Sequence, residues 1–202
     1  MEIIIAFVIS YLIGSISFSY IITKKIKKVD IRQHGSGNAG ATNTLRVLGV
    51  GPAVTVLLLD TAKGILAVLV TLWILGPGWA PALAGLAAIL GHNWPIYYGF
   101  RGGKGVATTI GVMSSIVFIP ALIGGLVAII AIALTRFVSL GSLLFMVATT
   151  IATILLANVY QYPMAYFYLS LIVTILSFWR HRLNVVRLIQ GTESKLGKKA
   201  TT

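Results

Sequence analysis

Two glycine-rich segments that also carry basic and hydroxyl side chains are the parts of this sequence best suited to chemistry. The first runs from His34 to Arg46 and reads HGSGNAGATNTLR, and the second covers residues 91–109 and reads GHNWPIYYGFRGGKGVATT. Glycines let a backbone approach an anion and turn its N–H groups toward it, and the start of a following helix adds partial positive charge. Both segments therefore indicate binding of phosphate or a similar anion.

The first segment combines neutral donors with one guanidinium, which provides a planar fork suited to phosphate. Its candidate ligands are Ser36, Gly37, Asn38, Thr42, Asn43 and Arg46. Residues 35–40 also form a formal GxGxxG pattern, but a dinucleotide site needs a preceding strand and a βαβ unit. An apolar block and a lysine run precede the pattern here, so we exclude that interpretation. The remaining alternative is an ordinary flexible loop with helix-capping residues.

In the second segment, Lys104 lies among Gly102, Gly103 and Gly105, directly before an apolar stretch. The spacing does not match the Walker A pattern. It still predicts an anion site made of backbone and an ammonium at the start of a helix. The alternative is a tight turn with one lysine that extends toward water. His92, near the start of the segment, is a further candidate ligand.

A third polar segment, RHRLNVVRLIQGTE at residues 180–193, follows the last apolar block. Basic residues at the inner end of a membrane span are the rule, so the arginines alone indicate little. His181 and Asn184 are three residues apart and would share one helix face if the span continued through them. A histidine there is expected to titrate near neutrality.

Acidic residues are scarce: the only ones are Glu2, Asp30, Asp60 and Glu193. No pair of carboxylates is placed to hold Mg²⁺, which argues against metal-dependent phosphotransferases of the membrane. The chain has no cysteine and no evident Ser-His-acid order. We therefore predict no metal and no cofactor, and an enzyme of this composition would work by positioning and cationic stabilisation.

The composition is that of a membrane protein. Of the 202 residues, 57% are hydrophobic and 10% are charged, and the mean hydropathy is +0.95. The apolar residues form long blocks at 3–22, 54–75, 81–90, 106–134, 140–157 and 164–179. Blocks that are apolar all round are typical of membrane spans. The net charge of +12 fits basic loops beside anionic lipid. Nucleic acid is not an expected partner, because the sequence contains no long basic helix.

The block at 106–134 decides the topology, because it is too long for one ordinary span and contains Pro120 near its middle. Two short helices meeting near Pro120 would place every basic loop on the same, cytoplasmic side. We therefore predict an all-α bundle of seven transmembrane helices, with the N-terminus outside and the C-terminus inside. The polar segments 23–49, 91–106 and 180–202 would then lie together. One transmembrane domain (1–190) and a polar tail (191–202) are expected.

Asp60 and Lys63 lie inside the second long apolar block at a spacing of three. Charges at that depth are costly and usually paired or functional. We expect a structural pair that faces the interior of the bundle.

Taken together, the three polar segments resemble the bacterial acyl-phosphate:glycerol-3-phosphate acyltransferase family. The resemblance rests on GSGNAGATNTLR, GHNWPIYYGFRGGKGVAT and RHRLNVVRLIQGTE, in the right order and separated by apolar blocks. It covers essentially the whole chain except the last few residues. None of the three histidines begins a His-x₄-Asp motif, which this family also lacks.

The resemblance implies an enzyme of phospholipid synthesis in the bacterial inner membrane, with its active site on the cytoplasmic face. It would transfer a fatty acyl group from acyl phosphate to the 1-hydroxyl of glycerol 3-phosphate and give lysophosphatidic acid. The implied catalytic residues are Lys104, His181 and Ser36. Gly102, Gly103 and Lys104 would hold acyl phosphate. The ligands expected for glycerol 3-phosphate are Ser36, Thr42, Asn43, Arg46, His181 and Asn184, with Gly37, Asn38 and His92 as further substrate-binding residues.

The residue types fit such a reaction, because both substrates and the leaving group carry phosphate. An acyl phosphate is already activated, so no covalent nucleophile is needed. The proton of the attacking hydroxyl would go to His181 or to a substrate phosphate oxygen, and the scarcity of carboxylates favours the phosphate. Besides the two substrates we expect contact with membrane lipid and no obligate protein partner.

Two other functions share the basic loops. A transporter of phosphate or organic anions would place its site near the bilayer midplane and often shows repeats, neither of which is evident here. A scaffold that holds anionic lipid would not need three separate polar motifs.

Overall fold

The protein is described by a computed structural model that covers residues 1–197, and within that range every regular element is a helix. The helices are α1 (Glu2–Gly14), α2 (Phe18–Lys27), η1 (Ile31–Gln33), α3 (Ala41–Leu48), α4 (Val50–Leu75), α5 (Trp79–Asn93), η2 (Ile96–Tyr98), α6 (Val106–Ile116), α7 (Phe118–Thr135), α8 (Val138–Tyr160), α9 (Met164–Arg180) and α10 (Arg182–Ile189). The expectation of an all-helical fold is confirmed.

Four segments in the described part of the chain are long and apolar enough to cross a membrane: Glu2–Lys27, Val50–Leu75, Phe118–Thr135 and Val138–Tyr160. The apolar helices α6 and α9 are shorter, and α5 has 15 residues. A bilayer core needs about 20 helical residues in an untilted span. The count of seven crossings and their direction therefore stay predictions.

The first apolar block is not one helix, as its composition suggested, but two. The chain leaves α1 at Gly14 and begins α2 at Phe18. A helix end inside an apolar bundle leaves carbonyl groups that need partners. The carbonyl of Ile16 in this break accepts a hydrogen bond from Lys63 Nζ of α4, 2.8 Å away. The break is therefore stabilised by a side chain of another helix.

The block at 106–134 is divided into α6 and α7, but the prediction that the two helices meet near Pro120 is wrong in its position. The break lies at Val117, whose backbone is extended (φ −137°, ψ 61°). Pro120 is the third residue of α7, where a proline is tolerated because the first N–H groups of a helix have no intrahelical partner. Only α6, with 11 residues, is short, because α7 has 18.

Glycines allow neighbouring helices to approach closely. A Cβ atom would overlap a backbone carbonyl of the facing helix at Gly14 and Gly91, where α1 crosses α5, and at Gly64 and Gly111, where α4 crosses α6. Small residues at such crossings are typical of membrane helices, which associate through close packing.

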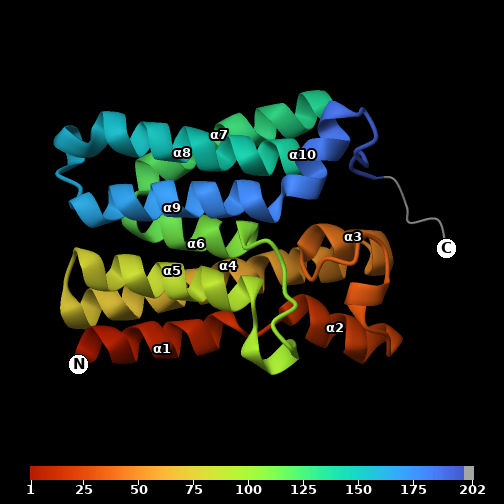
Figure 1. Cartoon of the computed structure of the whole chain (residues 1–202), viewed down its shortest axis with the longest axis horizontal. Helices are drawn as coiled ribbons and strands as arrows, with labels where there is room; N and C mark the ends of the chain where they lie inside the picture. The colour runs from red at the N-terminus through yellow and green to blue at the C-terminus, as the bar shows by residue number, and fades with distance from the viewer. Residues whose placement is uncertain (198–202) are drawn as a thin grey trace.

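The polar segments gather at one end of the bundle (Figure 1). There α2, α3, the segment between α5 and α6, and α10 lie together, while the N-terminus lies at the opposite end. The connection between α7 and α8 belongs to the same end, because the backbone N–H of Leu196 donates to the carbonyl of Arg136 at 2.7 Å. We call this the polar end of the bundle. Its assembly from distant parts of the chain agrees with the charge argument that predicted it.

Candidate functional site

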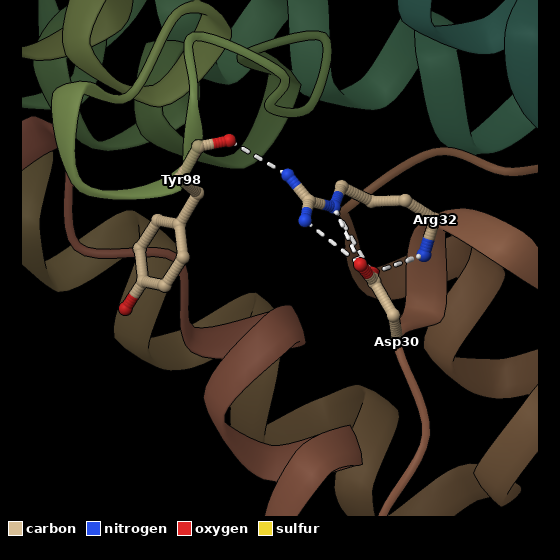
Figure 2. Close-up of polar contacts among 3 residues, drawn as sticks. All are labelled: Asp30, Arg32 and Tyr98. Carbon is tan, nitrogen blue, oxygen red and sulfur yellow. Dashed lines mark hydrogen bonds and ion pairs between the residues drawn. The ribbon is translucent and has the colours of Figure 1, made fainter.

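Arg32, just before the first glycine-rich segment, connects this part of the chain to the second segment (Figure 2). Asp30 accepts hydrogen bonds from the backbone N–H of Arg32 at 2.9 Å and from its guanidinium at 2.7–3.1 Å. The same guanidinium donates through Nη1 to the carbonyl of Tyr98 at 2.7 Å. The hydrogen bond from Arg32 holds the pKa of Asp30 below its usual value. We call this group the Asp30–Arg32 clasp; neither of its charged residues was among the expected site residues.

Asn43 shapes the first segment. Its side chain is buried, and Nδ2 donates to the carbonyls of Ile31 at 3.2 Å and His34 at 2.9 Å. Its Oδ1 accepts from the backbone N–H of Ser36 at 2.8 Å. Both amide protons are therefore used within the loop, and the predicted role of Asn43 as a substrate ligand would require these bonds to break.

The other polar side chains of the first segment are available for a ligand. Ser36 and Gly37 are exposed, and Asn38, Thr42 and Arg46 are half-buried. The side chains of Ser36, Thr42 and Arg46 make no hydrogen bond to any residue between 1 and 197. A hydroxyl or guanidinium in this state can donate to a phosphate group without losing another partner.

Lys104 is the point at which all three segments converge. Its Nζ donates to Oδ1 of Asn184 in the third segment. Burial lowers the pKa of Lys104 to about 8, and the charges of Arg187, Arg180 and Arg46 act in the same direction, against that of Glu193. The ammonium is therefore subject to the positive charge of guanidinium groups in both the first and the third segments. Such a cluster attracts anions strongly.

The segment around Lys104 is also fixed by Arg180 at the end of α9. Its Nη2 donates to the carbonyl of Gly103, and the guanidinium lies 5.2 Å from the centre of the Trp94 ring. Cation–π contact of this kind holds an arginine in place at little cost in solvation. The position of the glycine-rich backbone thus depends on Arg180 and Trp94, neither of which was predicted as a site residue.

We expect from the sequence that His181 and Asn184 share one face of a continued last span, but in the structure the span does not continue through them. α9 ends at Arg180, the chain turns at His181 and α10 begins at Arg182. Both side chains are nevertheless buried, with 2% and 7% exposed. The turn directs Asn184 to Lys104, so the structure brings these two predicted residues into contact.

The expectation that His181 titrates near neutrality is wrong. Burial, together with the nearby charge of Lys104, lowers the pKa of His181 to about 4. Its Nδ1 lies 2.9 Å from the carbonyl oxygen of Ser177, which can only accept, so Nδ1 carries the proton. The imidazole is therefore neutral at physiological pH, with Nε2 as its unprotonated nitrogen.

Glu193 organises the third segment and was not predicted as a site residue. One carboxylate oxygen accepts from Asn184 Nδ2 at 2.6 Å and from Ser139 Oγ at 2.7 Å, and the other from Arg187 Nε at 2.7 Å. Burial opposes its ionisation, but these hydrogen bonds outweigh burial and lower the pKa of Glu193. Its signal in the sequence was its rarity, since it is one of four acidic residues and the only one in a motif.

The predicted pair of Asp60 and Lys63 faces the interior of the bundle, with Nζ and Oδ1 2.8 Å apart. His92, predicted as a ligand, belongs to this pair: its Nδ1 lies 3.0 Å from Lys63 Nζ. The other ring nitrogen, Nε2, lies against Gly103, where a Cβ atom would overlap it. His92 therefore lies directly behind the glycine-rich backbone of the second segment.

The structure thus gathers an ammonium, guanidinium groups, hydroxyls and a neutral imidazole at the polar end of the bundle. Gly103, Lys104, His181 and Asn184 are in mutual contact or joined through one neighbour. Ser36, Thr42 and Arg46 lie in the adjoining loop and helix. Groups of this kind bind phosphate and stabilise negative charge that develops during its transfer.

Comparison with known proteins identifies a family over almost the whole chain. The family model described as "Glycerol-3-phosphate acyltransferase" matches residues 4–191. A glycerol-3-phosphate acyltransferase of Halalkalibacterium halodurans is 67% identical over 195 residues, which are 96% of this chain and 95% of the relative. The enzyme of the same name from Shouchella clausii is 63% identical over 191 residues, 94% of this chain and 93% of the relative.

Two crystal structures resemble the fold closely. Both are of PlsY (YgiH), described as an integral membrane glycerol 3-phosphate acyltransferase. The glycerol 3-phosphate form has a TM-score of 0.90 and 37% identity, and covers 98% of this chain and 96% of its own. The lysophosphatidic acid form has a TM-score of 0.87 and 35% identity, with the same coverage.

Proposed function

Because this chain belongs to the glycerol-3-phosphate acyltransferase family, we propose that it transfers a fatty acyl group from acyl phosphate to glycerol 3-phosphate. The chain is an integral membrane acyltransferase; the donor, the position acylated and the mechanism are the proposal. The acyl group goes to the 1-hydroxyl, and lysophosphatidic acid and inorganic phosphate are released. The observation that carries the proposal is the convergence of three polar segments on Lys104.

Gly102, Gly103 and Lys104 hold the acyl phosphate in this proposal. When the carbon–oxygen bond to phosphate breaks, negative charge grows on the leaving phosphate. An ammonium that Asn184 already holds in place can stabilise that charge without reorganising. Arg180 keeps the backbone of Gly103 fixed while this happens.

Glycerol 3-phosphate lies against the first segment, where Ser36, Thr42 and Arg46 have unused donors. Arg46 provides the paired donors that suit a phosphate monoester. Asn43 contributes by holding the loop that presents Ser36. The crystal structure of a relative in its glycerol 3-phosphate form supports this choice of substrate.

The proton of the attacking hydroxyl passes to a substrate phosphate oxygen. The oxygen of the 1-hydroxyl forms a bond to the acyl carbonyl carbon, the bond from that carbon to the phosphate oxygen breaks, and the proton leaves with phosphate. His181, with its pKa lowered to about 4, is a weaker base than a phosphate monoester dianion, whose conjugate acid has a pKa of about 6. His181 then serves as a neutral acceptor that orients the substrates.

The polar end faces the cytoplasm in this proposal, which places the water-soluble substrate on the side where it is made. The acyl chain of the donor extends between helices toward the lipid. Four strongly apolar segments and two shorter apolar helices support a multi-pass membrane protein, and its location in the inner membrane is part of the proposal.

The purified protein in detergent tests the proposal. With acyl phosphate and glycerol 3-phosphate we expect release of phosphate and formation of 1-acyl lysophosphatidic acid. Acyl-CoA in place of acyl phosphate is expected to give no product. Product formed only from acyl-CoA, or no product from either donor with protein that binds glycerol 3-phosphate, would contradict the proposal.

A further inference from the structure

A buried cluster of charged residues lies directly behind the glycine-rich backbone. Lys63 Nζ is 2.8 Å from Oδ1 of Asp60, 3.0 Å from Nδ1 of His92 and 2.8 Å from the carbonyl oxygen of Ile16. The three side chains are at most 5% exposed. The ammonium thus makes two hydrogen bonds and one ion pair inside the bundle.

The pair of Asp60 and Lys63 does not by itself join two helices. Both residues lie on one turn of α4, so their attraction holds only the lysine in place. Charges at this depth in a membrane protein are costly, so those that are present usually serve packing or function. What the lysine joins are its two other partners, Ile16 and His92, which belong to different parts of the chain.

Each of those two partners lies in a part of the chain that leads into one of the two glycine-rich segments. Ile16 is in the break before α2, and α2 leads into the first segment. His92 lies in the last turn of α5, at the start of the second segment. One ammonium therefore links the break before α2 to the last turn of α5, where the second segment begins.

Gly103 is enclosed by His92 on one side and by Ala39 of the first segment on the other. Its N–H donates to the carbonyl of His92 at 3.1 Å. A Cβ atom on Gly103 would overlap both Nε2 of His92 and the carbonyl oxygen of Ala39, which precedes α3. A tilt of the imidazole would therefore displace the backbone that positions Lys104.

We propose that Lys63, held by Asp60 and acting through His92, is a positioning residue for acyl transfer. It fixes the backbone of residues 102–104 against the first segment, and it does not touch either substrate. The inference rests on the proposed function for its choice of donor, but the contacts that carry it do not depend on that choice.

The test compares a neutral pair with a matched control. Asp60→Asn/Lys63→Met removes both charges together, so that no single buried charge is left. Thr71→Val is the control, because Thr71 is a buried polar residue of the same helix whose hydroxyl donates to the carbonyl of Ala67 one turn earlier, at 2.8 Å. His92→Gln is the second variant, since it leaves the ion pair intact. KM for acyl phosphate and kcat per folded enzyme are measured, with thermal unfolding in detergent as the measure of folding.

We expect the double variant and His92→Gln to raise KM for acyl phosphate and to lower kcat/KM on the order of 10–100-fold, as small misplacements of a catalytic group do. Thr71→Val should change both constants by less than about twofold. A merely structural pair would reduce the amount of folded enzyme and leave KM unchanged. Normal KM and kcat per folded enzyme in either variant would overturn the inference, and His92→Gln decides alone if the double variant does not fold.

The wild-type enzyme is assayed alongside. If it releases no phosphate from acyl phosphate, the proposed donor is contradicted rather than the positioning role. The variants are then compared by their affinity for glycerol 3-phosphate, measured by calorimetry. Affinities equal to that of the wild type would overturn the inference in that case.

Discussion

Among single residues, Lys104 makes the activity depend on pH in a direction that can be worked out. Its folded pKa of about 8 lies below the ordinary value of lysine, so the ammonium loses its proton as pH rises through 8. Since kcat/KM reports the free enzyme, it should be level from pH 6.5 to 7.5 and fall about tenfold per pH unit well above pH 8. A bound phosphate favours the ammonium, so the fall in kcat should come at higher pH. Assays between pH 6.5 and 9.5 measure both.

Lys104→Met is the control for this assignment. It should lower kcat/KM by about 100-fold or more and abolish the alkaline fall. A variant that keeps the same alkaline fall would show that another group titrates. His181 should contribute no change between pH 5.5 and 7.5, because its pKa of about 4 leaves it neutral throughout.

Glu193 provides a second pH-dependent effect, on stability. Its folded pKa is lowered, so its contribution is present above the ordinary pKa of a glutamate, 4.5, and is lost as pH falls through the folded pKa. Glu193→Gln should therefore lower the unfolding temperature at pH 7, where three donors lose a charged acceptor. The difference from the wild type should shrink below pH 4. An equal difference at pH 7 and pH 3.5 would contradict this explanation.

Residue types and spacing predicted candidate ligands but not the residues that hold those ligands in place. Lys104 and Asn184 are 80 positions apart, and their contact required three dimensions. The acidic residues Asp30 and Glu193 were counted in the sequence only as too few to bind a metal, whereas the structure shows each of them holding a motif in place. The sequence also could not predict the protonation state of His181, because the pKa of its imidazole depends on how deeply the fold buries it.

At the scale of elements, the Asp30–Arg32 clasp should control how the first two segments face each other. Arg32→Gln removes its bonds to Asp30 and to Tyr98. We expect KM for glycerol 3-phosphate to rise about three- to tenfold, the loss expected for one or two hydrogen bonds. Arg101→Gln is a matched control, since Arg101 is an exposed residue of the second segment. An equal rise in both variants would attribute the effect to lost positive charge instead of the clasp.

The glycine crossings should respond to a single methyl group according to what faces it. Gly111→Ala would drive a Cβ into the carbonyl of Thr61, so we expect a loss of about 1–3 kcal/mol in the free energy of unfolding. Gly125→Ala in α7 meets no atom within 4 Å and should be neutral or stabilising by about 0.5–1 kcal/mol. Unfolding in detergent measures both. Equal losses would contradict close packing of α4 on α6.

The predicted ends of helices agreed with the structure where polar residues marked them. Inside apolar blocks the predicted and observed ends differed. The break before Phe18 lies within a continuous apolar run, and its stabilising partner Lys63 is 47 positions from Ile16. Pro120 was expected to mark the division between α6 and α7, but a proline also fits the first turn of a helix, and the chain breaks at Val117. Local pattern could not distinguish these two uses of proline.

For the whole molecule, the direction of the spans can be tested by labelling, because the chain has no cysteine of its own. Asn158→Cys at the end of α8 should react with a membrane-impermeant maleimide in intact cells. Lys195→Cys should react only after permeabilisation, since both side chains are exposed but at opposite ends of the bundle. A fold with one span over residues 106–134 would reverse both results. Pro77→Cys, exposed and outside in either topology, controls for labelling.

The bond between Asn184 and Glu193 has a consequence for the timing of synthesis. A ribosome adds residue 193 only after every apolar helix has been synthesised, and only then can Glu193 hold Asn184 in its place beside Lys104. A chain cut short before Glu193 would keep its helices and its glycine-rich segments, but the Asn184 side chain beside Lys104 would lose its carboxylate partner. Full acyl transfer activity would therefore require that residue 193 has been made.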